Sequence, residues 1–166
     1  SDATASFTSG IDSTYKEYMF VFNSVHAETD SVDLTFQGST NGGSSYGITM
    51  TTSFFRAYHQ EDGGGAGLGY VTGKDLAQST SYQPLTYDIG ADNDQAVSGI
   101  LRLYNPSSTT FVKHFIAQSS DIFASDGNGN RLIAGYFNTT SAINAVQFKM
   151  SSGEIQGGTI DLFGVV

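Results

Sequence analysis

The sequence has no cysteine among its 166 residues. It therefore offers no disulfide framework, no thiol nucleophile and no thiolate ligand for a metal. A chain of this length forms one domain that buries roughly 70% of its extended-chain surface, so it needs no disulfide or metal in order to fold. The lack of cysteine leaves the compartment open, because a domain of this size is stable outside a cell without disulfides.

Basic residues are also scarce, and none of them cluster along the chain. There are 7 Lys and Arg against 16 Asp and Glu, which gives a formal net charge of −9. The bases stand singly at Lys16, Arg56, Lys74, Arg102, Lys113, Arg131 and Lys149. Nucleic-acid binding needs a concentrated basic surface that displaces counterions, and an anionic membrane needs the same. We therefore expect no nucleic-acid partner and no attraction to anionic lipid.

Long apolar runs are missing as well. None approaches the stretch of about 18 residues that would mark a membrane span, so no membrane insertion is expected. The first ten residues, SDATASFTSG, are small and polar and lack both the basic start and the apolar run of a signal peptide. We expect residues 1–10 to form a flexible N-terminal segment and residues 11–166 to form a single β-sandwich domain.

Helix-forming residues are thin, whereas Ser, Thr, Gly and aromatic residues are abundant. The chain has Gly 20, Phe 12 and Tyr 9, and no segment shows a helical stripe over ten residues. Apolar residues instead alternate with polar ones at a period of two. The predicted strands, most of which show this alternation, are 15–25, 32–38, 46–50, 54–59, 85–89, 98–105, 111–117, 132–138 and two more within 145–166. The sequence predicts an all-β antiparallel sandwich, a jelly roll of about eight strands in the first place and another Greek-key sandwich in the second.

Three local predictions follow from the same pattern. The turn at residues 40–43, TNGG, predicts a hairpin between 32–38 and 46–50. Both faces of 15–25 are apolar, which predicts a central strand covered on both sides. The chain ends in LFGVV after an alternating stretch, which predicts a last strand inside a sheet whose deletion from residue 160 onward would abolish folding.

Two glycine-containing motifs resemble catalytic or phosphate-binding loops. Residues 43–47, GSSYG, match the G-x-S-x-G pattern of serine hydrolases, but they lead into a strand instead of the helix which that elbow requires. The glycine-rich run at 63–69 has neither dinucleotide nor P-loop spacing, since Asp75 stands where a P-loop needs Ser or Thr. The first motif is interpreted as a turn and the second as a surface loop.

Candidate metal ligands lack the spacing of a recognised site. Residues 126–130, DGNGN, resemble the start of a calcium loop, but Arg131 and Phe137 stand where that loop needs Gly and Glu. The acids Asp88, Asp92 and Asp94 favour a solvated loop, and His26, His59 and His114 lie far apart, so that His114 is expected to be packed within its strand. We predict no catalytic, cofactor-binding or metal residues and no enzymatic activity, and a hydrolase with a carboxylate pair stays a minor alternative.

Aromatic residues suit either a core or a sugar-binding platform. Most Phe positions fall on the predicted inward faces, so the core is their default place. Tyr is amphipathic and common at interfaces, so its role stays open. A carbohydrate-binding module would show coplanar, exposed Tyr or Phe on one sheet face.

Several segments resemble small virion-type proteins of marine tailed bacteriophages, including cyanophages. They are FTSGIDSTYKEYMF (7–20), TSFFRAYHQED (52–62), DNDQAVSGILRLYNPSSTTFVKHFIA (92–117), AGYFNTTSAINAVQFKMSSG (134–153) and GTIDLFG (158–164). The resemblance covers nearly the whole chain from Phe7, and it brings no catalytic motif with it.

The resemblance implies a non-enzymatic virion structural protein on the particle exterior, as a tail, fibre or receptor-binding component. Capsid decoration and a carbohydrate-binding module are the alternatives. The implied partners are other virion proteins, further copies of the chain in a homo-oligomer, with a trimer expected, and a host surface glycan.

Overall fold

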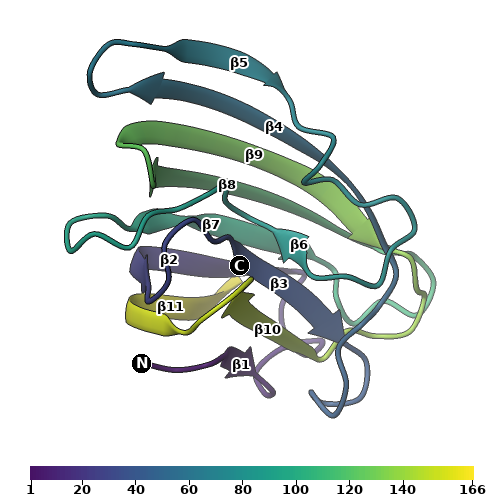
Figure 1. Ribbon diagram of the computed structural model, residues 1–166. Coiled ribbons are helices and arrows are strands. Elements are labelled where there is room, and N and C mark those ends of the chain that lie inside the picture. Colours follow the sequence, from purple (N-terminus) through teal and green to yellow (C-terminus); the bar gives the residue numbers. More distant parts are fainter.

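The computed structural model describes residues 1–166 as eleven β-strands without a helix, arranged in two antiparallel sheets (Figure 1). Seven strands form the large sheet in the order β11-β2-β7-β8-β9-β4-β5, and four form the small sheet in the order β1-β10-β3-β6. The bounds are β1 Ala5–Phe7, β2 Glu17–Ala27, β3 Leu34–Ser39, β4 Met50–Gln60, β5 Ala66–Tyr70, β6 Gln83–Pro84, β7 Val97–Tyr104, β8 Lys113–Phe123, β9 Gly127–Phe137, β10 Ala145–Met150 and β11 Ile155–Val165. The all-β class and the sandwich are confirmed.

The connections differ in part from the predicted jelly roll. Strands β7, β8 and β9 are consecutive in the chain and adjacent in the large sheet, where they form a meander. Eleven strands stand in place of about eight, and the jelly-roll connectivity is not confirmed. The small sheet has fewer strands than the large one, so Figure 1 shows it in front of the lower part of the large sheet, with β4 and β5 above it.

The core lies between the sheets and is rich in phenylalanine. Phe20 of β2 and Phe36 of β3 are fully buried and both pack against Phe148 of β10. Phe36 also meets Phe115 of β8 edge to face, with ring centroids 4.9 Å apart. The Phe20–Phe148 and Phe36–Phe115 pairs join the two sheets, and their edge-to-face geometry suits the quadrupoles of aromatic rings.

The predicted hairpin between 32–38 and 46–50 is wrong. Strand β3 belongs to the small sheet, while β4 starts only at Met50 and belongs to the large sheet. Gly42 and Gly43 do have the positive φ values of 70° and 85° that the turn sequence predicted, but the chain then crosses between sheets. The alternation of side chains defines the faces of a strand and leaves its partner undefined.

The C-terminal strand lies at an edge of the large sheet and not inside it. Strand β11 pairs with β2, antiparallel from Ile155 to Val165, and its other edge has only a single bridge from Ile155 to Asp2. Its Ile160 and Leu162 pack against the core, which explains the apolar end of the chain. Strand β2 is central, between β11 and β7, but only its inward face is fully buried, so the predicted cover on both faces is absent within the monomer.

The N-terminal segment differs from the flexible end expected for residues 1–10. It contains β1, which pairs with β10, and Phe7 of β1 packs edge to face against Phe20 with ring centroids 5.2 Å apart. Residues of the glycine-rich run also form β5, the outermost strand next to β4. Both segments are too short for periodicity to distinguish them from loops.

Candidate functional site

The motifs that resembled catalytic loops lie in non-catalytic surroundings. Ser44 of the GSSYG motif is exposed in the link between β3 and β4, and its hydroxyl donates to the carbonyl of Asn41. No helix follows it and the chain turns at residues 41–44, but the strand predicted at 46–50 begins only at Met50.

The candidate metal ligands do not converge. No group of three His, Asp or Glu side chains has the geometry of a metal site. Residues 127–130 begin β9, so Asn128 and Asn130 point outward from a strand while Asp126 remains in the turn. His114 was predicted to be packed, but it is exposed on the outer face of β8 beside Tyr136.

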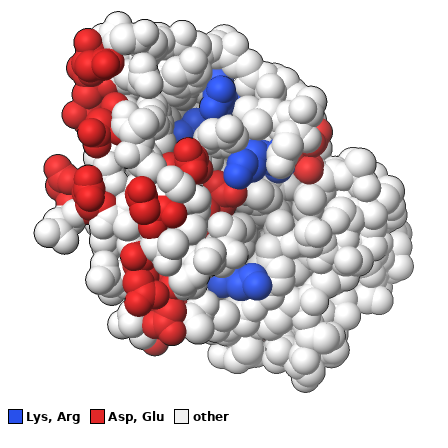
Figure 2. Space-filling model, viewed as in Figure 1, with Lys and Arg blue, Asp and Glu red and all other residues white.

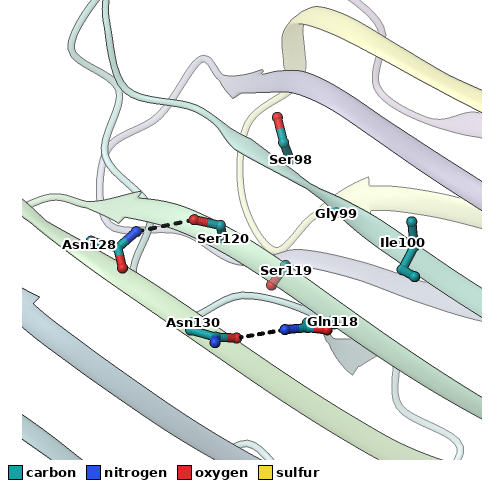
Figure 3. Close-up of a pocket in the computed structure, with 8 residues that line it drawn as sticks. All are labelled: Ser98, Gly99, Ile100, Gln118, Ser119, Ser120, Asn128 and Asn130. Atoms are coloured by element: carbon teal, nitrogen blue, oxygen red, sulfur yellow. Dashed lines mark hydrogen bonds between the residues drawn. The ribbon is translucent and has the colours of Figure 1, made fainter.

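One hollow lies on the outer face of the large sheet and is lined almost wholly by neutral polar groups (Figure 3). It has a volume of about 330 Å³ and spans three neighbouring strands, β7, β8 and β9. Asn128 donates to Ser120 at 3.1 Å, and Gln118 donates to Asn130 at 3.4 Å. The hollow presents amides and hydroxyls without a titratable group, so it can bind by hydrogen bonds but offers no acid or base.

Large apolar side chains lie on the same outer face as this hollow. Those that remain about half exposed or more are Phe55, Leu68, Tyr70, Ile116, Leu132 and Phe163. Leu132 of β9 is directly opposite Phe55 of β4, which is opposite Tyr70 of β5. The rings of Phe55 and Tyr70 are perpendicular at 89°, so they do not form the coplanar platform that a carbohydrate-binding module would show.

A second site lies on the inner face, above the edge of the small sheet, and contains three of the seven basic residues. Arg56 of β4, Lys74 and Arg131 of β9 surround the ring of Tyr87, with their cationic centres 4.8, 4.8 and 5.7 Å from its centroid. Arg56 lies equally close to the ring of Tyr58. We call this the cationic cleft. Figure 2 shows Lys and Arg atoms gathered in the upper middle of this face, with carboxylates along the left-hand side.

Two of the three cations are paired with acids. Arg131 binds Asp121 of β8 through two hydrogen bonds of 2.8 and 2.9 Å, and both side chains are buried. Burial raises the pKa of Asp121, although the guanidinium of Arg131 opposes that rise. Lys74 pairs with Asp33. Arg56 has no ion pair, and its guanidinium is stabilised by the rings of Tyr58 and Tyr87 without being neutralised.

Sequence reasoning missed this cleft because its bases stand 18 and 57 positions apart, at 56, 74 and 131. The tertiary structure brings them together through the pairing of β4 with β9, where Arg56 is directly opposite Arg131. One pattern in the sequence could have indicated their inward direction. Residues two positions apart in a strand lie on the same face. Arg56 is two positions from Phe54 and Arg131 is two positions from Ile133, and Phe54 and Ile133 belong to the core.

The structure contains no helix with the length and hydrophobicity that a bilayer crossing requires.

Comparison with protein-family models, with curated proteins and with solved structures gave no match for this chain.

Proposed function

We propose that this chain is a non-enzymatic structural protein of a bacteriophage virion, exposed on the particle exterior as a tail, fibre or receptor-binding component. The observation that supports it best is the outer face of the large sheet, where exposed apolar side chains from several strands lie without a covering layer. The resemblance of its segments to virion-type proteins points in the same direction.

The outer face has the character of an assembly surface. Monomeric proteins seldom expose many large apolar side chains together, and such surfaces mark contacts with other chains. Phe55, Tyr70 and Leu132 lie side by side across three strands, and each is 45–47% exposed. In this proposal the face is covered by another copy of the chain or by a neighbouring virion protein.

Purified virions test the location of the protein. Mass spectrometry should find the chain in particles that have been separated from free protein, and antibody-labelled electron micrographs should show it at the tail. Its absence from purified particles would overturn the proposal.

Capsid decoration is the alternative location. Cross-linking in intact particles separates the two, since a tail component will be linked to tail proteins and a decoration protein to the major capsid protein.

A carbohydrate-binding module is the second candidate function. It is supported by the cationic cleft, which combines polar and aromatic groups on the inner face of the large sheet. Glycan-array binding by the isolated chain tests this candidate, and an array without any bound glycan would contradict it.

A further inference from the structure

Arg131 has a hydrogen-bond donor that the protein itself does not use. The residue is only 1% exposed, and it lines a cavity of about 180 Å³ in the cationic cleft. Its Nε and Nη2 bind Asp121, and Nη2 also donates to the carbonyl of Tyr87 at 3.3 Å. Its Nη1 is buried and has no partner. A buried donor without an acceptor costs free energy, so an oxygen acceptor from a ligand would be bound favourably there.

Arg56 adds an unneutralised positive charge to the same cavity. It makes no salt bridge and no hydrogen bond to a carboxylate, and its guanidinium carbon lies 4.8 Å from the ring centroids of both Tyr58 and Tyr87. Aromatic rings hold a cation without occupying its N–H donors. A guanidinium held in this way is suited to a planar carboxylate, which it can bind through two parallel hydrogen bonds.

The rest of the cavity favours a hydroxyl-bearing ligand over a simple anion. Gln60, Asp88 and Ser125 line it together with the two arginines, and they supply amide, carboxylate and hydroxyl groups. Its volume would hold roughly six waters at about 30 Å³ each, which suits one sugar ring or acid group. A second hollow of about 500 Å³ continues from it and shares Arg56, Tyr58 and Tyr87, so a longer ligand has room along β5.

The charge of the whole chain limits how acidic that ligand can be. The net charge is −9, and carboxylates lie along one side of the face that contains the cleft (Figure 2). A densely charged polyanion such as nucleic acid would be repelled, and the cleft has only one cation without an acidic partner. A ligand with a single carboxylate among neutral sugars is repelled little by the negative chain, and its one charge matches the one cation without an acidic partner.

We propose that the cationic cleft binds a glycan with one carboxylate-bearing sugar, whose carboxylate is bound by Arg56 and by the free Nη1 of Arg131 while Gln60 and Ser125 bind its hydroxyls. This proposal rests on the carbohydrate-binding candidate and names the ligand class of its cleft, but it does not depend on where the protein sits in a particle. Binding in solution and location in the virion can therefore fail separately.

Calorimetric titration of the full chain with glucuronyl-galactose tests the proposal, and the methyl ester of the same disaccharide is the uncharged control. We expect the acid to bind at least tenfold more tightly than the ester. Inorganic phosphate at the same concentration should not displace it. Equal affinity for acid and ester, no binding of the acid, or displacement by phosphate would each overturn the proposal.

Two matched variants locate the binding. Arg56→Gln removes the unpaired charge and should weaken binding of the acid at least tenfold. Arg102→Gln removes the same charge from an arginine that pairs with Glu17 on the outer face, and it should change the affinity less than twofold. Circular dichroism checks that both variants are folded. Unchanged affinity in a folded Arg56→Gln variant would contradict the assignment.

Discussion

Gly129 makes the buried ion pair between Arg131 and Asp121 possible. It is directly opposite Asp121 in the pairing of β8 with β9, and a Cβ atom at this position would overlap the guanidinium of Arg131 and a carboxylate oxygen of Asp121. The glycine therefore leaves the space in which the two charges meet. A buried pair of this kind is costly to break, because the remaining charge stays buried without its partner.

Asp121→Ala should lower the free energy of unfolding by about 3–5 kcal/mol, since it leaves Arg131 charged and unpaired in the interior. Urea denaturation measures the change. The double variant Asp121→Ala with Arg131→Met is the control and should recover much of the loss, because it removes both charges. A loss under about 1 kcal/mol in the single variant would show that the pair is not important for stability.

Lys113 is a further buried charge, and it makes stability depend on pH. It has no exposed surface, and its ammonium donates only to the carbonyl of Thr139 at 3.2 Å. Burial lowers the pKa of Lys113 in the folded state. At pH values between the folded-state pKa and the ordinary pKa of lysine, the unfolded chain binds more protons than the folded chain. The free energy of unfolding should therefore rise with pH across this range. Below the folded-state pKa, the full cost of burying the charged ammonium remains.

Lys113→Met should therefore be more stable than the wild type at pH 7 and should lack the alkaline rise. Thermal unfolding from pH 7 to 11 measures both effects. Lys16→Met removes an exposed lysine and serves as the control, with stability close to that of the wild type at each pH. A less stable Lys113→Met variant at pH 7 would show that the ammonium is a net stabilising group.

At the scale of elements, β11 combines an edge position with a structural role. It covers β2 along most of its length, and its inward residues Ile160 and Leu162 pack against the core. Beyond the bridge of Ile155 to Asp2, its outer side has no partner strand, which leaves a row of backbone groups available for pairing with another chain.

Deletion of residues 160–166 should still prevent folding, although the strand is not inside a sheet. The deletion removes two packed side chains and most of the backbone partners of β2, and circular dichroism with a solubility assay measures the result. Deletion of Val166 alone is the control, because this residue is fully exposed and lies beyond β11. A soluble, cooperatively folding product of the longer deletion would contradict the expectation.

At the scale of the whole molecule, the large sheet is covered on its inner face only. The inner face of the large sheet carries the core and the cationic cleft, while its outer face carries Phe55, Leu132 and the neutral hollow of Figure 3. Burial of apolar side chains drives association, so this face should make the chain assemble with further copies, and the trimer is the form that the resemblance to virion-type proteins implies.

Sedimentation velocity should detect that assembly at micromolar concentration. The double variant Phe55→Ser with Leu132→Ser should shift the distribution toward monomer by removing two adjacent apolar groups. Phe111→Ser is the matched control, because Phe111 is 69% exposed but lies outside the strands of the large sheet. A wild-type chain that stays monomeric would contradict the assembly role of the outer face.

The inward and outward faces of the long strands could be predicted from the sequence, because the alternation of Phe20 and Phe148 with their polar or smaller neighbours follows the pleat itself. The cleft could not, because a strand's partner depends on packing between segments far apart in the chain. Arg56 and Arg131 meet only because β4 lies beside β9. The short strands β1 and β5 also escaped prediction, since three to five residues are too few to show a period.

The sequence by itself determined the all-β class, the absence of thiol chemistry and, for most long strands, the division into a core face and an outer face. These follow from residue composition and from the period of two that any extended chain imposes. Only the tertiary structure decided that β3 and β4 belong to different sheets, that the apolar C-terminus forms an edge strand, and that three scattered bases share one cleft around Tyr87. Those outcomes depend on which strands pair, and pairing is determined by the packing of the whole core instead of by any one segment.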